Sequence, residues 1–201
     1  MNKKYLFILI IIIGILLFKL KLSTKSPEET ITLTPAEMQY QAEKGNALAQ
    51  FYTGYLYLDK QNYKEAIKWY KKAAEQGLAD AQVSLGILYK EGSSIKQDYQ
   101  QAFQWFQKAA AQKSMSAQLF LGEMYYLGLG LKQDYQQAFQ WFQKASNQGS
   151  PHAKAILGVM YYSGEGVTKN ITVATQYLQQ ACKDDMQQAC DLILKLNSES
   201  Q

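Results

Sequence analysis

Apolar and polar residues alternate with a helical period through the middle of the chain. Between residues 99 and 109, five apolar side chains recur at steps of three and four, and Gln100, Gln101, Gln104 and Gln107 lie on the other face. This spacing places the apolar residues on one face of an amphipathic helix. The apolar positions are Tyr99, Ala102, Phe103, Phe106 and Ala109.

The stretch that contains this helix occurs twice. KQDYQQAFQWFQKA runs from Lys96 to Ala109 and again, without a change, from Lys132 to Ala145, which defines a period of 36 residues. Looser copies begin at Asn62 and Asn170. A fixed period of this size predicts a stack of similar units, each too small to bury its apolar face alone.

A second recurring segment lies between these copies and predicts the other helix of each unit. It begins at Ala49, Ala81, Ala117 and Ala153. In the second copy, Ala81, Leu85, Leu88 and Tyr89 form the apolar stripe. Gly86, Gly122 and Gly158 share one mid-helix position, where we expect a bulky partner to press against the backbone. Gly92, Gly128 and Gly164 then predict left-handed helix ends.

Capping residues mark where the helices begin. Asp98, Asp134 and Asn62 stand at N-cap positions, each with a glutamine or glutamate three residues later. Thr34, Pro35 and Glu37 predict an additional helix that opens the array and extends to about Lys44. The segment from Met186 to Leu196 is expected to cover the other end.

The N-terminus carries an uninterrupted apolar run from Tyr5 to Phe18, which extends to Leu22 if two lysines are included. KLKLSTKSP after the run offers no small-x-small cleavage site, so we favour an uncleaved membrane anchor over a cleaved signal peptide. Lysines flank both ends and leave the orientation open. The expected organisation is an anchor at 1–22, a linker at 23–34, a repeat domain at 35–197 and a tail at 198–201.

Charge and composition narrow the range of partners. The formal net charge is +4, but five of the 21 basic residues lie at or before Lys25, and 16 lysines face 17 acidic residues beyond it. The chain has no arginine, so the bidentate contacts typical of nucleic-acid readers are missing and no nucleic-acid partner is expected.

Candidate catalytic chemistry is sparse. His152 is the single histidine, and any Ser/His/Asp or Cys/His arrangement would need it. Cys182, Cys190 and His152 lack a fourth donor and the paired spacing of a metal site. We therefore expect no catalytic residue, no metal, no cofactor and no small-molecule substrate.

Cys182 and Cys190 are eight residues apart. On one unbroken helix their Cα atoms would lie about 12 Å apart, beyond the reach of a disulfide. The repeat register instead puts them on two consecutive helices, with KDDM as the bend. This arrangement allows either a disulfide or two buried thiols.

The pattern A-x-x-x-L-G-x-x-Y-x-x-G-x-G-V, followed by D-Y, A, W and K-A, resembles the Sel1-like repeat, a relative of the tetratricopeptide repeat. The resemblance covers roughly Gly45 to Asp191. It implies an all-α fold, a right-handed α/α superhelical solenoid of helix-turn-helix repeats. Ser94 replaces a loop glycine, Lys113 replaces a closing glycine and Tyr177 replaces a tryptophan.

The cysteine spacing is similar to that of the cysteine-rich bacterial branch of this family, which implies a Cys182–Cys190 disulfide and an oxidising compartment. We therefore expect a single-pass protein of the bacterial inner membrane with its repeats in the periplasm. The alternative is a secreted or periplasmic protein after signal cleavage.

Related repeats bind partners on a concave face lined by the first helix of each unit. By this resemblance, two lanes of residues are expected to contact a protein or peptide. The first lane contains Tyr55, Ile87, Glu123 and Val159, and the second contains Leu58, Lys90, Tyr126 and Tyr162.

The leading prediction for the function is a non-catalytic scaffold for protein–protein interaction in the bacterial envelope. Sel1-like proteins of this size also resemble immunity proteins that neutralise secreted lipase-type toxins in the periplasm. Cysteine-rich members are further linked with β-lactam binding or hydrolysis, but no S-x-x-K motif occurs here.

Overall fold

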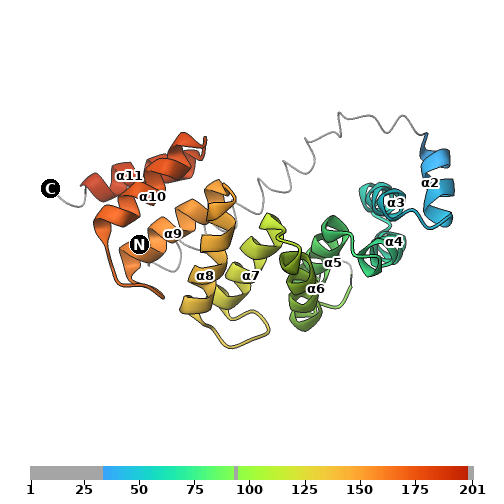
Figure 1. Cartoon of the computed structure of the whole chain (residues 1–201), viewed down its shortest axis with the longest axis horizontal. Helices are drawn as coiled ribbons and strands as arrows, with labels where there is room; N and C mark the ends of the chain where they lie inside the picture. Colours follow the sequence, from blue (N-terminus) through green and yellow to red (C-terminus); the bar gives the residue numbers. More distant parts are fainter. Residues whose placement is uncertain (1–33, 93–94, 199–201) are drawn as a thin grey trace. The chain divides into compact units, whose positions relative to one another are not determined.

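A computed structural model of the chain describes residues 34–92 and 95–198, and this part consists of ten α-helices joined by short turns and loops (Figure 1). In chain order they are α2 (Pro35–Glu43), α3 (Ala47–Asp59), α4 (Tyr63–Glu75), α5 (Ala79–Glu91), α6 (Tyr99–Ala111), α7 (Met115–Leu127), α8 (Tyr135–Asn147), α9 (Pro151–Ser163), α10 (Ile171–Lys183) and α11 (Gln187–Ser198). The prediction of an all-α helical repeat is confirmed.

The helices divide into two compact units. The N-terminal unit contains α2 to α6 and most of α7, through Met124, together with residues 129–131. The C-terminal unit contains the end of α7 and helices α8 to α11. Consecutive helices pack on one another within each unit, as for α3 with α4 and α9 with α10.

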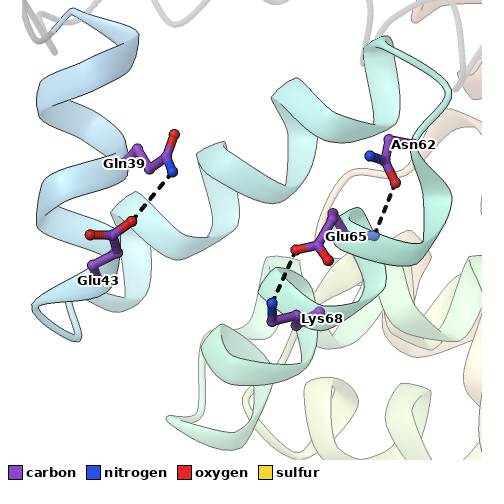
Figure 2. Close-up of polar contacts among 5 residues, drawn as sticks. All are labelled: Gln39, Glu43, Asn62, Glu65 and Lys68. Atoms are coloured by element: carbon purple, nitrogen blue, oxygen red, sulfur yellow. Dashed lines mark hydrogen bonds and ion pairs between the residues drawn. The ribbon is translucent and has the colours of Figure 1, made fainter.

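Side-chain caps fix the starts of the helices, as the sequence predicts. Thr34 Oγ1 accepts from the Glu37 backbone N–H, and the Glu37 carboxylate accepts from the Thr34 backbone N–H, which completes a capping box. At the start of α4, Asn62 Oδ1 accepts from the Glu65 backbone N–H at 3.3 Å (Figure 2). Within the same helix, Lys68 forms an ion pair with Glu65 at 3.2 Å. In α2, a hydrogen bond between Gln39 and Glu43 spans one helical turn (Figure 2).

The helix ends also follow the prediction, with one informative exception. Gly92 and Gly164 adopt left-handed conformations at the C-caps of α5 and α9, with φ of 66° and 77°. Lys113 stands where Gly77 and Gly149 close other repeats, and it adopts φ of 63°. Since a Cβ disfavours this conformation, the turn after α6 carries a local strain that glycine would relieve.

Close contact between paired helices explains the mid-helix glycines of the first helices. A Cβ placed on Gly86 would lie 2.4 Å from the Phe106 ring, and one on Gly158 would lie 2.7 Å from Leu178 Cγ. In these two pairs, the second helix therefore presses a large side chain directly onto the backbone of the first. Phe106 and Leu178 are fully buried by this contact.

Aromatic and aliphatic residues fill the interiors of both units. In the N-terminal unit, Tyr70 and Leu85 join the alanines of α4 and α5, with Trp105 against the same cluster. In the C-terminal unit, Tyr161 stacks on Tyr177 at 5.7 Å between ring centroids. The tyrosine at the tryptophan position thus keeps the packing of the repeat.

A pair of glutamines links successive helix pairs at their ends. Gln82 Nε2 donates to the Ala74 carbonyl at 3.0 Å, and its Oε1 accepts from Gln112 Nε2 at 2.9 Å. Gln50 and Gln76 repeat this arrangement one unit earlier, at 2.7 Å. In the fourth repeat, Lys154 and Asp184 occupy the same two positions and form an ion pair at 2.6 Å, so both members of the pair have changed together.

A disulfide closes the C-terminal end of the array. Cys182 on α10 and Cys190 on α11 are bonded, with their Cα atoms 5.0 Å apart. Met186, between α10 and α11, and Leu192 on α11 are also buried. Helix α11 therefore covers the last repeat, as expected of a terminal lid.

The predicted anchor and linker, residues 1–33, and Ser94 lie outside the described residues. Within residues 34–92 and 95–198, no helix is both long and apolar enough to span a bilayer.

Candidate functional site

The eight residues predicted to face a partner all lie on the first helices of the repeats. Tyr55 and Leu58 come from α3, Ile87 and Lys90 from α5, Glu123 and Tyr126 from α7, and Val159 and Tyr162 from α9. Their exposure differs widely. Tyr55 is exposed, Leu58, Ile87 and Tyr162 are partly buried, and the other four are buried.

Lys90 and Glu123 form an ion pair between consecutive first helices. Lys90 Nζ lies 3.2 Å and 3.0 Å from the two carboxylate oxygens of Glu123, and each side chain is only 8% exposed. The ammonium group also lies 4.9 Å from the centre of the Phe120 ring. Burial raises the pKa of the Glu123 carboxyl, while Lys90 acts in the opposite direction. The pair therefore joins α5 to α7 and presents little charge to solvent.

Tyr126 is engaged in a polar contact with the next repeat. Its hydroxyl donates to Glu165 Oε2, and its ring packs edge-on against Tyr135 at 5.0 Å between centroids. Burial, and then the hydrogen bond to Glu165, raise the pKa of Tyr126 well above its ordinary value. Glu165 was not identified from the sequence as a partner of Tyr126. Its position between Gly164 and Gly166, in the loop of the repeat, could have marked it as a candidate.

Helix α3 carries an exposed apolar stripe that includes one of the predicted residues. Leu48 and Tyr55 are seven residues apart and therefore lie on one helix face; they are 45% and 41% exposed. Tyr52 lies between them and is partly buried. We call Leu48, Tyr52 and Tyr55 the α3 stripe. These side chains together offer an apolar surface to a partner.

Comparison with known proteins identifies the repeat. The Sel1 repeat model matches residues 47–78, 79–114, 116–150 and 151–186, which together make up more than half of the chain. The chain belongs to the Sel1 repeat family. The resemblance seen in the sequence is thus confirmed, and each matched segment contains one of the helix pairs α3–α4, α5–α6, α7–α8 and α9–α10.

Solved structures of bacterial Sel1 repeat proteins are similar to this chain. A protective antigen present in uropathogenic Escherichia coli strains, with an SLR fold, is 32% identical over 84% of this chain and 37% of its own, with a TM-score of 0.81. A Sel1 repeat protein from Oxalobacter formigenes is 36% identical over 75% of this chain and 63% of its own, with a TM-score of 0.70. This chain thus spans less than two thirds of either relative.

The Helicobacter pylori cysteine rich protein B is 32% identical over 66% of this chain and 96% of its own, with a TM-score of 0.53. A search of curated proteins finds no match. These comparisons identify a helical scaffold of the kind typical of protein-interaction proteins.

The Sel1 repeats show little that could support chemistry. Among residues 34–92 and 95–198, no group of three or more histidine, cysteine, aspartate or glutamate side chains is placed to hold a metal ion. His152 lies in the first turn of α9. Cys182 and Cys190 are consumed by their disulfide.

Proposed function

We propose that this Sel1 repeat protein is a non-catalytic scaffold of the bacterial envelope, and that it binds a protein or peptide through the first helices of its repeats. The proposal includes a right-handed superhelical stacking of the repeats, with these helices on the concave side. The α3 stripe is the centre of the contact in the N-terminal unit, where Leu58 and Ile87 extend it, and Tyr162 is a separate contact of the C-terminal unit.

The exposure of Leu48 and Tyr55 is the observation that carries the proposal. Asp80 and Ser116 occupy the position of Leu48 in the second and third repeats, so the fold itself does not require an apolar residue there. The equivalents of Tyr55 in the third and fourth repeats, Glu123 and Val159, are buried. Apolar side chains grouped on one exposed face, unlike a single exposed one such as Ile171, are typical of protein–protein contacts.

The disulfide supports a location in the envelope. Disulfides form and persist in oxidising compartments such as the bacterial periplasm, and Cys182 and Cys190 are bonded. The apolar run from Tyr5 to Phe18 adds a route to the membrane, either as an uncleaved anchor or as a signal that is removed. We therefore propose that the repeats lie outside the cytoplasm.

Co-purification from envelope fractions tests the α3 stripe. We would compare the unaltered protein with a Leu48→Ser/Tyr55→Ser variant, and with Ile171→Ser as a matched control. Ile171, on α10 of the C-terminal unit, is similarly exposed, at 55%, and is not part of the stripe. Each variant should retain its helical circular dichroism, because exposed substitutions usually change stability by less than about 0.5 kcal/mol.

The expected result is a protein that co-purifies with the unaltered chain and with Ile171→Ser but is lost with the double variant. Equal recovery with all three would move the interface elsewhere. The identity of the recovered protein also distinguishes the alternatives, since a secreted lipase-type toxin would support the role of an immunity protein.

A further inference from the structure

We propose that the outer face of α4 docks on an anionic membrane surface. The face is formed by Lys64, Lys68, Lys71 and Lys72, which we call the lysine face. This inference rests on the proposed envelope location and adds a second surface, separate from the α3 stripe, with a lipid rather than a protein partner.

The four lysines lie together because of their spacing. They occur at steps of four, three and one along α4, which places them on one side of the helix, opposite the buried Ala66, Tyr70 and Ala73. All four are exposed. Lys72 lies over the Trp69 ring at 4.1 Å, so its ammonium group is held close to the helix surface.

Two acidic residues share this side of α4 without neutralising it. Lys68 pairs with Glu65 at 3.2 Å and Lys71 with Glu75 at 3.9 Å. The lysine side chains in these pairs nonetheless remain 57% and 58% exposed. Exposed pairs of this kind are weak, and four cations against two anions leave a positive face.

The other repeats show that the fold does not need these lysines. At the positions of Lys64, Lys68 and Lys71, both α6 and α8 carry glutamine. These are Gln100, Gln104 and Gln107 in α6, and Gln136, Gln140 and Gln143 in α8. Only Lys72 is kept in both, as Lys108 and Lys144, each stacked over a tryptophan. The extra positive charge of α4 is therefore a feature of the first repeat alone.

This concentration of charge stands out against the rest of the repeat domain. Residues 60–72 contain five of the 16 lysines that follow Lys25 and only one acidic residue, Glu65. Over the whole chain beyond Lys25, acidic residues outnumber lysines. A binding partner with negative charge would therefore be directed to the first repeat.

The position of the first repeat in the chain favours lipid headgroups as the source of that charge. Residues 19–33 separate the apolar run from the first described helix, and a chain of this length spans at most about 50 Å. An anchor in the membrane would thus hold α4 near the bilayer at a high effective concentration. Lysines clustered on one surface and held close to a bilayer attract anionic lipid headgroups.

Lysine acylation of the full-length protein on vesicles tests the proposal. A water-soluble reagent would be applied with vesicles of phosphatidylcholine alone, or of equal parts phosphatidylcholine and phosphatidylglycerol, and modification of each lysine measured by mass spectrometry. Lys108 and Lys144 serve as internal controls, because they share the position and the tryptophan contact of Lys72.

On the anionic vesicles we expect Lys64, Lys68, Lys71 and Lys72 to react at least about threefold more slowly than on neutral ones, with the difference lost in high salt. Lys108 and Lys144 should react equally on both. The triple variant Lys64→Gln/Lys68→Gln/Lys71→Gln should also lose the protection of Lys72, whereas Lys96→Gln/Lys108→Gln/Lys132→Gln should keep it.

Equal reaction rates of the α4 lysines on both kinds of vesicle would overturn the proposal. If the α4 lysines reacted equally slowly on both kinds of vesicle, the proposal would also fail, because protein rather than lipid would then cover them. Flotation with neutral vesicles separately reports whether the N-terminal segment anchors the chain, so failure of the anchor and failure of the lysine face are distinguishable.

Discussion

The buried Lys90–Glu123 pair gives the sharpest test of how the repeats are joined. The position of Lys90 is occupied by Leu58 in the first repeat, and that of Glu123 by Ile87 in the second. Lys90→Leu/Glu123→Ile therefore rebuilds the preceding apolar junction in place of the ion pair. The two single variants instead leave one buried charge without its partner.

The size of the effect follows from the geometry. At 3.0 Å and an effective dielectric constant of about 20, two unit charges attract by roughly 5 kcal/mol. Desolvation costs several kcal/mol for each ion, so the net contribution of the pair is close to zero. Removing one partner, however, should cost about 3 to 5 kcal/mol. The double variant should lie within about 1 kcal/mol of the unaltered protein, or be more stable.

Urea unfolding followed by circular dichroism measures these differences, and pH adds a second signature. The pKa of Glu123 is raised in the folded protein. The folded state therefore holds the Glu123 proton more tightly than the unfolded state does. The contribution of Glu123 to the free energy of unfolding thus falls as pH rises above the ordinary glutamate pKa of about 4.3. Lys90→Leu removes the group that lowers this pKa, so in that variant the fall should be larger and should continue to higher pH. In the double variant, this contribution disappears.

Two results would refute the reasoning. If Lys90→Leu were as stable as the unaltered protein at neutral pH, then the carboxylate would not be buried against the lysine. If the double variant were destabilised as strongly as the single variants, the ion pair would contribute a net stability that apolar residues cannot replace.

Three further predictions concern the helix turns and the C-terminal repeat. Reduction of Cys182–Cys190 should lower the free energy of unfolding by about 2 to 3 kcal/mol, with hydrogen exchange rising first in α11; unchanged exchange there would contradict it. Lys154→Gln should destabilise by about 0.5 kcal/mol, and Lys154→Gln/Asp184→Gln should restore stability and remove its salt dependence, as measured by thermal unfolding with and without salt. Lys113→Gly should raise the stability in urea by about 0.5 to 1 kcal/mol because φ is 63°, and no gain would argue against strain.

Much of the fold follows from periodicity. The 36-residue repeat and the three- and four-residue spacing of apolar side chains predict the helix pairs, because each amphipathic helix needs a neighbour to cover its apolar face. The caps at Asp98 and Asp134 were predictable since each bond joins residues three apart. The role of Gly86 was predictable because glycine destabilises a helix relative to alanine. Its recurrence at this position therefore indicates a side chain packed closely against the backbone.

The surface was harder to predict, because its burial depends on neighbouring repeats. The pattern within α5 marks Lys90 as a surface residue, but its partner Glu123 lies 33 residues away. Tyr126 is likewise covered through Glu165, which lies 39 residues later. Helical spacing predicts which residues share one face of a helix. It does not predict which side chains of neighbouring repeats cover that face. The lanes predicted from the sequence therefore mix packing residues with accessible ones such as Tyr55.

The lysine face could be recognised from the sequence only by comparing equivalent positions of the repeats. A run of lysines on one amphipathic helix is ordinarily a solvated surface. The contrast with glutamine at the same positions of α6 and α8 separates what the fold requires from what the first repeat adds.

Site-specific photo-crosslinking in the native host tests the central claim of a protein-binding scaffold most directly. A photo-reactive amino acid would replace Tyr55 on the α3 stripe and, as a control, the exposed Gln104 on α6. The account predicts one defined adduct with another envelope protein from position 55 and none from position 104. Absence of any adduct at position 55, or the same adducts from both positions, would contradict it.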